Sequence, residues 1–356
     1  MDIEKSGIIE MKTTKHDQTF NIMKGLAIIS VVIGHCSIPE IEGFVNQYHL
    51  AVFYFIAGYF FNPTYVDKPW EFIKKRINRL YLPFVYYGLA FLMLHNIFCN
   101  IGLYSHDAIY SWRNYVTESL RLVIRIASNE PFMGAMWFAS SLFLVSLLYI
   151  LLVQLRRYGK CWLLGGVIFC FLTGYVAIQA NIKNPYCIFD TLMIMVIYQM
   201  GVLFHENSLF NRYIGLKTTI ISTILVIVIY LLGGTIRLQS SGMASNNLIL
   251  FVLVPLMGVI MIFGLSKWIS KLKWAKYISI CGEYSFEIMA LHFISFKIVA
   301  LVHSYFTDGS FSHLAEFPVY KANLEWWSPV YTVVGCVIPI LITTLCRTIK
   351  SKLINK

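Results

Sequence analysis

The 356-residue chain is 58% hydrophobic and only 13% charged, with a mean hydropathy of +0.66. About a quarter of the residues in a typical soluble domain are charged, so this composition excludes an ordinary soluble protein. Apolar runs of about 20 residues, separated by short basic loops, instead predict an all-α fold: a polytopic transmembrane helical bundle.

About ten apolar segments are long enough to be membrane spans. Lys and Arg gather in alternate connecting segments, which places those segments and both termini on the inner side. This topology accounts for the net charge of +11, so we expect no nucleic-acid partner. We expect one membrane domain over 1–356, without a removable signal peptide, because the first 19 residues are polar and no cleavage pattern follows them. The predicted spans are 20–36, 44–61, 80–98, 135–155, 161–180, 186–206, 216–233, 247–266, 284–304 and 328–347.

The first span contains two ionisable residues, Lys24 and His35, in the run KGLAIISVVIGH. Eleven helical residues make roughly three full turns, so both side chains lie on one helix face, roughly 16 Å apart along the axis. Ionisable residues inside a bilayer are costly and usually face a protein interior or a watery cavity. The alternatives are that Lys24 extends to the inner interface and that His35 makes a hydrogen bond in helix packing. The pair on one face favours a functional site.

The second span begins with His49, in NQYHLAVFYFIAGYFF. Because it returns from the outer side, His49 and His35 lie at similar depth in consecutive antiparallel helices, where they can meet. An imidazole titrates near neutral pH and is therefore suited to remove a proton from a hydroxyl group.

The third span begins with a cluster of cations in FIKKRINRLYLPF. Arg76 and Arg79 are three residues apart and share a face if the segment is α-helical, and Pro83 can kink the helix. Planar guanidinium groups suit phosphate recognition, although cations here also follow from topology alone. Phosphate-binding charge inside and a base farther out would match coenzyme A, which has a phosphorylated head and a long arm ending in a thioester.

The segment between the third and fourth spans contains an expected interfacial amphipathic helix, because apolar residues recur at helical spacing over 112–124. Farther along, Trp137 and Asp190 lie near the predicted outer side and are candidates for contacting a substrate. Trp137 also fits an aromatic belt at the membrane interface. Glu287 and His292 in the ninth span could line a cavity or serve local packing.

The eight cysteines are scattered, without a CxxC motif or metal-ligand spacing. We therefore expect no metal site and no permanently bound cofactor. We expect unpaired thiols at apolar sites; the alternative is a disulfide on the outer side, which Cys36, Cys99 and Cys187 could reach.

These motifs resemble those of the acyltransferase 3 family of membrane O-acyltransferases, in particular its fucose 4-O-acetylase-like branch. The family's first-helix motif is a basic residue and a histidine separated by ten residues, here Lys24 and His35, and its Arg-x-x-Arg motif matches Arg76 and Arg79. MWFASSLFL at 136–144 and YSFEIMALH at 284–292 are similar to two later family segments. The resemblance covers the whole chain.

Three positions depart from the family pattern. Lys24 stands where arginine is common, so bidentate recognition is lost there. Asn21 stands where aspartate is frequent, and Ala57 replaces the usual serine. These departures affect individual contacts rather than the reaction class.

The resemblance implies an O-acetyltransferase that moves an acetyl group from cytoplasmic acetyl-CoA to a sugar hydroxyl of a cell-surface polysaccharide or its lipid-linked precursor. The enzyme would be a multi-pass protein of the bacterial cytoplasmic membrane, in contact with membrane lipids. Arg76 and Arg79 would bind the phosphates and Lys24 the arm of acetyl-CoA, while His35, supported by His49, would deprotonate the carbohydrate acceptor. The alternative is an exporter of a lipid-linked sugar or small solute, which often shows internal repeats and discontinuous helices.

Overall fold

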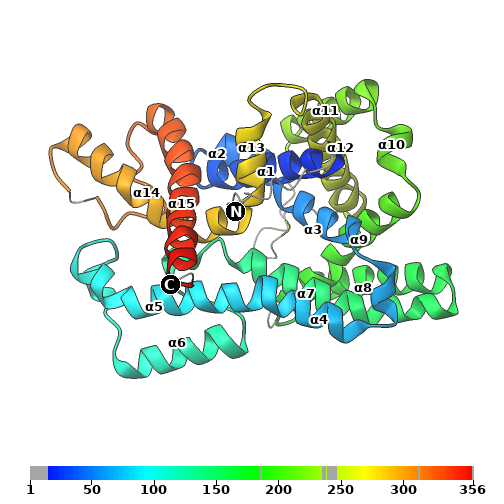
Figure 1. The fold of residues 1–356 in the computed structure, drawn as a ribbon, viewed down its shortest axis with the longest axis horizontal. Coiled ribbons are helices and arrows are strands. Elements are labelled where there is room, and N and C mark those ends of the chain that lie inside the picture. Colours follow the sequence, from blue (N-terminus) through cyan, green and yellow to red (C-terminus); the bar gives the residue numbers. More distant parts are fainter. Residues whose placement is uncertain (1–14, 185–186, 235–237, 239–246, 312, 355–356) are drawn as a thin grey trace, which may run out of the picture.

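The computed structural model describes residues 15–184, 187–234, 238, 247–311 and 313–354. Within these ranges the chain forms helices and no strands (Figure 1). The expectation that no signal peptide is removed concerns residues that lie largely outside these ranges. The first residue of the predicted span 186–206 also lies outside them. The helices are α1 (Lys15–Gly34), α2 (Pro39–Val45), α3 (His49–Tyr59), α4 (Pro69–Arg76), α5 (Leu82–Asn100), α6 (Trp112–Ile124), α7 (Trp137–Leu152), α8 (Lys160–Gln179), α9 (Ile188–Glu206), α10 (Leu209–Tyr213), α11 (Leu216–Leu231), α12 (Leu248–Ile269), α13 (Ala275–Glu283), α14 (Ser285–Asp308) and α15 (Leu324–Ile354).

The all-α, polytopic architecture is confirmed. Among the described residues, seven helical segments are long and apolar enough to cross a membrane, and 18–34 and 216–231 form shorter apolar helices. The predicted span 44–61 is interrupted: α2 ends at Val45 and α3 begins at His49. Tyr48, with φ −139°, precedes α3 and lies outside helical geometry. The count of ten spans and their orientation stay predictions.

Helix α1 lies at the centre of the bundle, where it packs against α3, α12, α13, α14 and α15 (Figure 1). Its contact with α13 is the closest, because both helices present glycine. A Cβ atom at Gly282 of α13 would overlap the backbone oxygen of Asn21, and one at Gly25 of α1 would overlap that of Ile278. These glycines therefore let the two backbones approach directly, as small residues do between membrane helices.

Helices α4 and α5 form one continuous helical segment, Pro69–Asn100, with a π-helical turn, Ile77–Tyr81, between them. Pro83 has no backbone N–H, and its ring crowds the preceding turn, so a widened turn just before it relieves the clash. The sequence predicts that Pro83 can kink the helix; the structure shows a π-helical turn just before this proline. That turn follows Arg76 and contains Arg79.

Helix α6 has the bounds that the sequence predicts, and it runs antiparallel along α5 (Figure 1). The side chain of Asn96 exchanges two hydrogen bonds with the backbone of Tyr110 before α6. At the other end, the Tyr81 hydroxyl donates to the Val123 carbonyl oxygen at 3.0 Å. Leu122 is the buried residue of α6. The apolar residues Trp112, Val116, Leu120 and Ile124 are exposed, so one face of α6 is free to contact lipid.

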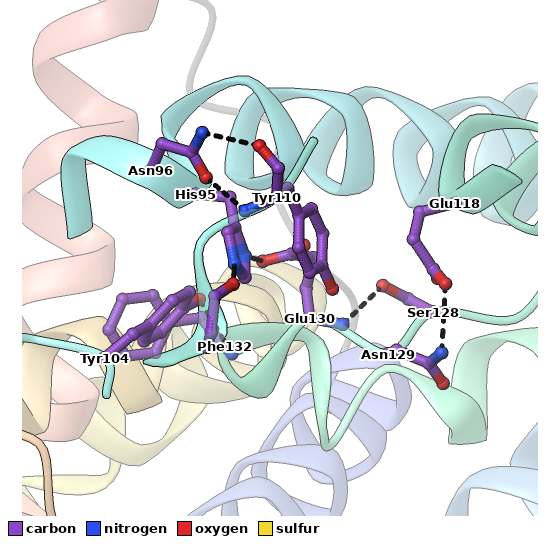
Figure 2. A network of polar contacts seen from close by, with 10 residues as sticks. His95, Asn96, Tyr104, Tyr110, Glu118, Ser128, Asn129, Glu130 and Phe132 are labelled. Carbon is purple, nitrogen blue, oxygen red and sulfur yellow. Dashed lines mark hydrogen bonds and ion pairs between the residues drawn. The ribbon is translucent and has the colours of Figure 1, made fainter. Parts of the chain in front are cut away.

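A buried polar pair connects the end of α5 to the loop before α7 (Figure 2). His95 is 2% exposed and Glu130 3% exposed, and their Nδ1 and Oε2 atoms are 3.0 Å apart. The other ring nitrogen of His95 donates to the Ala108 carbonyl oxygen at 2.8 Å, and the ring stacks on Tyr110. The pair thus fixes the start of the segment that leads to Trp137.

We expect Glu130→Ala to lower the free energy of unfolding by about 1–3 kcal/mol, because it leaves the buried His95 nitrogen without a partner. Glu130→Gln preserves a hydrogen bond and should cost much less.

Burial raises the pKa of Glu130 above its usual range. The carboxyl group therefore favours the folded state at low pH, and this advantage is lost as pH rises through the folded-state pKa. The melting temperature of Glu130→Gln, compared with that of the unchanged protein, should therefore be more favourable at pH 8 than at pH 4.5. A constant difference between the two proteins would contradict this assignment.

Candidate active site

Two of the predicted histidines line one cavity. Its volume is about 110 Å³, and its wall includes His35, His49 and Trp137. Each comes from a different part of the fold: His35 directly follows α1, His49 is the first residue of α3, and Trp137 is the first residue of α7. The expected meeting of the first two spans is therefore present in the structure.

The ring of His35 stacks against a third imidazole, that of His292 on α14. The two ring centroids are 5.3 Å apart with an interplanar angle of 21°, and the Phe293 ring lies 4.9 Å from His35. These contacts hold the ring by its faces. Within the described chain no hydrogen bond engages the ring nitrogens of His35, so they are available to a reactant in the cavity.

The other two imidazoles are oriented by backbone carbonyl groups. His49 Nδ1 lies 2.5 Å from the Val45 oxygen, and His292 Nδ1 lies 2.9 Å from the Ile288 oxygen. A carbonyl oxygen only accepts hydrogen bonds, so in each neutral ring the hydrogen is assigned to Nδ1 and Nε2 keeps its lone pair. Nε2 of His292 is buried and has no hydrogen-bond partner in the described chain.

Lys24 lies three turns before His35 on α1, half-buried beside α13. Its ammonium group interacts electrostatically with Glu283, the last residue of α13. It does not line the cavity of His35. Helix α1 holds Lys24 and His35 apart, by roughly 16 Å at the usual rise of 1.5 Å per helical residue.

Arg76 and Arg79 differ in their surroundings. Arg76 points into the bundle: its Nη2 donates to the Tyr198 hydroxyl at 3.3 Å, and its guanidinium lies 4.8 Å from the centre of the Phe72 ring. Arg79 is exposed in the π-helical turn, where residues advance by a smaller angle than in an α-helix. The spacing argument for a shared face does not hold there. No described carboxylate pairs with either residue, and Arg76 Nε is buried without a partner in that part of the chain.

A family comparison decides what kind of protein carries this arrangement. The sequence model described as an acyltransferase domain matches residues 17–348. The chain belongs to the acyltransferase 3 family. No curated protein and no solved structure matches it. The family and the long apolar helices together indicate an integral, multi-pass membrane acyltransferase.

The other predicted site residues of the acyltransferase lie in different places. Trp137 and His292 belong to the centre just described, through the cavity wall and the stack on His35. Asp190, in the first turn of α9, accepts a hydrogen bond from Asn184 at 2.7 Å. Glu287 does not line the cavity and forms an ion pair with Arg347 of α15 at 2.7 Å.

Sequence reasoning missed two polar residues of the acyltransferase cavity, Glu42 and Asn46. Both precede His49, at spacings of seven and three residues. No continuous helix covers 42–49, because α2 ends at Val45 and α3 begins at His49, so helical spacing gave no signal that would have revealed them. The break between α2 and α3 re-aims the chain here, so a carboxylate and an amide enter the same cavity as two imidazoles.

Proposed function

We propose that this acyltransferase is an O-acetyltransferase of the bacterial cytoplasmic membrane. Its donor is acetyl-CoA, and its acceptor is a sugar hydroxyl of a cell-surface polysaccharide or of a lipid-linked precursor. The observation that carries the proposal is that His35 and His49 line one cavity inside a membrane acyltransferase, while His292 stacks on the ring of His35. General-base chemistry on a hydroxyl needs such an imidazole with an open nitrogen.

In the proposed reaction, a ring nitrogen of His35 accepts the proton of the acceptor hydroxyl. The acceptor oxygen then forms a bond to the carbonyl carbon of the thioester, and the carbon–sulfur bond breaks. The departing thiolate takes the proton back from His35, which yields the ester and free coenzyme A. The stack on His292 and the contact with Phe293 fix the His35 ring for both proton transfers.

Arg76 and Arg79 are assigned to the phosphates of the donor, and Lys24 to the arm that leads toward His35. Support comes from their unused hydrogen-bond donors, since no described carboxylate neutralises either guanidinium. Charge-assisted bonds to phosphate are stronger than neutral ones, and a guanidinium group makes them in pairs.

The decisive experiment is to incubate the purified protein with acetyl-CoA and to measure free thiol with and without candidate sugars. We expect thiol release that depends on the sugar, together with the acetylated sugar in the mass spectrum. Heat-inactivated protein provides the background rate. Sugar-independent release, or none with a broad panel of glycans, would contradict an O-acetyltransferase of carbohydrates.

Sidedness gives a second test. The predicted topology puts the donor on the inner side, so in sealed vesicles of known orientation acetyl-CoA on the cytoplasmic side should acetylate an acceptor confined to the other side. The unmodified acceptor should not cross the membrane, and its flux is measured in the same vesicles without acetyl-CoA. Flux without acetylation would favour an exporter, while acetylation only with both substrates on the cytoplasmic side would overturn the assigned sidedness.

A further inference from the structure

A second cavity adjoins the histidine cavity and shares one wall with it. Its volume is about 160 Å³, and it is enclosed by the start of α5, the loop after α6 and the first turns of α7. Trp137 lines both cavities. One water molecule occupies about 30 Å³ of liquid, so the space would hold roughly five waters. A small ring or a charged substituent fits such a volume.

Among the described residues that line this second cavity, Arg125 is the only charged one. It follows the last residue of α6, and its side chain is exposed. A cation at a helix C-terminus is favourable by itself, which explains a positive charge here but not the guanidinium group. In the described chain Arg121 pairs with Glu118, whereas no carboxylate pairs with Arg125. Its donors are therefore free for an anion.

Ser140 supplies a second, independent sign of a polar ligand. Its side chain lines the same cavity and is only 8% exposed, yet its hydroxyl finds no hydrogen-bond partner in the described chain. A buried hydroxyl without a partner is costly. The neighbouring Ser141 is satisfied by the Tyr54 hydroxyl at 2.8 Å. The unused hydroxyl of Ser140 thus points to a group that comes from outside the protein.

We infer that this cavity binds the acceptor, and that the acceptor is a carbohydrate bearing an oxyanion, either a carboxylate or a phosphate. The inference rests on the proposed function. Arg125 would hold the oxyanion in a bidentate manner, Ser140 would bond a sugar hydroxyl, and the flat indole face of Trp137 would pack on the sugar ring. A sugar held there presents its next hydroxyl past Trp137 to the imidazoles of the adjoining cavity.

Cys187 allows this to be tested without turnover, because it lines the same cavity and is exposed. The purified protein is treated with N-ethylmaleimide in the presence of glucuronate, glucose 6-phosphate or glucose, and alkylation of each cysteine peptide is followed by mass spectrometry. We expect glucuronate or glucose 6-phosphate, but not glucose, to slow the alkylation of Cys187. Cys161 and Cys346, which are exposed elsewhere, serve as internal controls and should be unaffected.

Variants connect the protection to Arg125. In Arg125→Ala the half-protecting concentration should rise about tenfold or more, as expected for the loss of a charge-assisted hydrogen bond. Arg125→Lys keeps the charge at the helix end but loses the planar guanidinium group that makes paired hydrogen bonds. Its protection should therefore be intermediate between that of Arg125→Ala and that of the unchanged protein. Arg113→Ala is the matched control, since Arg113 is an exposed arginine on α6 that does not line the cavity. It should behave like the unmodified protein.

Protection by glucuronate alone would identify a carboxylate, and protection by glucose 6-phosphate alone a phosphate. No protection by either anion, or equal protection in Arg125→Ala, would overturn the inference. Because the assay needs neither acetyl-CoA nor transfer, its failure leaves the chemistry at His35 untouched. Conversely, intact protection without sugar-dependent thiol release would contradict the proposed function and leave the binding site standing.

Discussion

Replacing His35 with alanine should lower kcat for acetyl transfer by about 10²–10⁴-fold, because a general base contributes this much to a proton-transfer step. The binding of coenzyme A should change little, since its assigned cations lie elsewhere. Turnover is measured by thiol release, and donor binding is measured separately by calorimetry. Among the described residues, the aromatic rings that contact the ring of His35 are those of His292 and Phe293, so its removal should leave the fold intact.

His205→Ala is the matched control for this variant. His205 is an exposed histidine in the last turn of α9 and does not line the cavity, so its loss should leave kcat unchanged. A His35→Ala protein that keeps more than about a tenth of normal turnover would remove the general-base role from His35. If His49→Ala lost turnover to this extent and His35→Ala did not, the general-base role would pass to His49.

Replacing Arg79 with alanine should raise the KM for acetyl-CoA by about tenfold or more and leave kcat nearly unchanged. One charge-assisted hydrogen bond to phosphate accounts for such a factor, and its loss affects ground-state binding. Arg79 is preferable to Arg76 for this test because Arg76 also contacts Tyr198 and Phe72. Removing the Arg76 side chain would disturb packing as well as binding. The double variant should show a larger rise in KM than either single one.

Lys74→Ala controls for net charge, because Lys74 is exposed, lies on α4 close to Arg79 in sequence and forms no ion pair in the described chain. An equal rise in KM in Lys74→Ala and Arg79→Ala would indicate general electrostatic attraction. Unchanged affinity for coenzyme A in the Arg76 and Arg79 variants would return both arginines to a purely topological role.

The helices of this protein are well predicted by hydropathy, because membrane spans are long apolar runs whose boundaries depend on local sequence. The span predicted at 80–98 appears as α5, Leu82–Asn100, and the amphipathic pattern at 112–124 appears as α6 with the same bounds. The break between α2 and α3 was not predicted. Residues 44–61 read as a continuous apolar run, and only packing against other helices shows where the chain turns.

Some contacts of the candidate site could likewise be predicted from the sequence, and others could not. The approach of His35 to His49 follows from two consecutive antiparallel helices, so spacing and topology sufficed. The stack of His292 on His35 depends on how α14 crosses α1, and this crossing is set by tertiary contacts. Likewise, the π-helical turn that separates Arg76 from Arg79 changes their relative direction, which a calculation based on α-helical geometry could not anticipate.

The position of each imidazole relative to a helix end has an electrostatic consequence. His35 directly follows α1, and its backbone N–H still bonds to the Val31 and Val32 carbonyl oxygens, so it lies at the negative end of the helix dipole. Such an end stabilises a cation by about 0.3–2 kcal/mol, which favours the imidazolium that the proposed general-base role would form at His35. His49 opens α3 and lies at the positive end of that helix, where a charged ring is disfavoured. In the proposed mechanism, the dipoles of α1 and α3 therefore act in opposite directions on the two imidazoles and favour His35 over His49 as the proton acceptor.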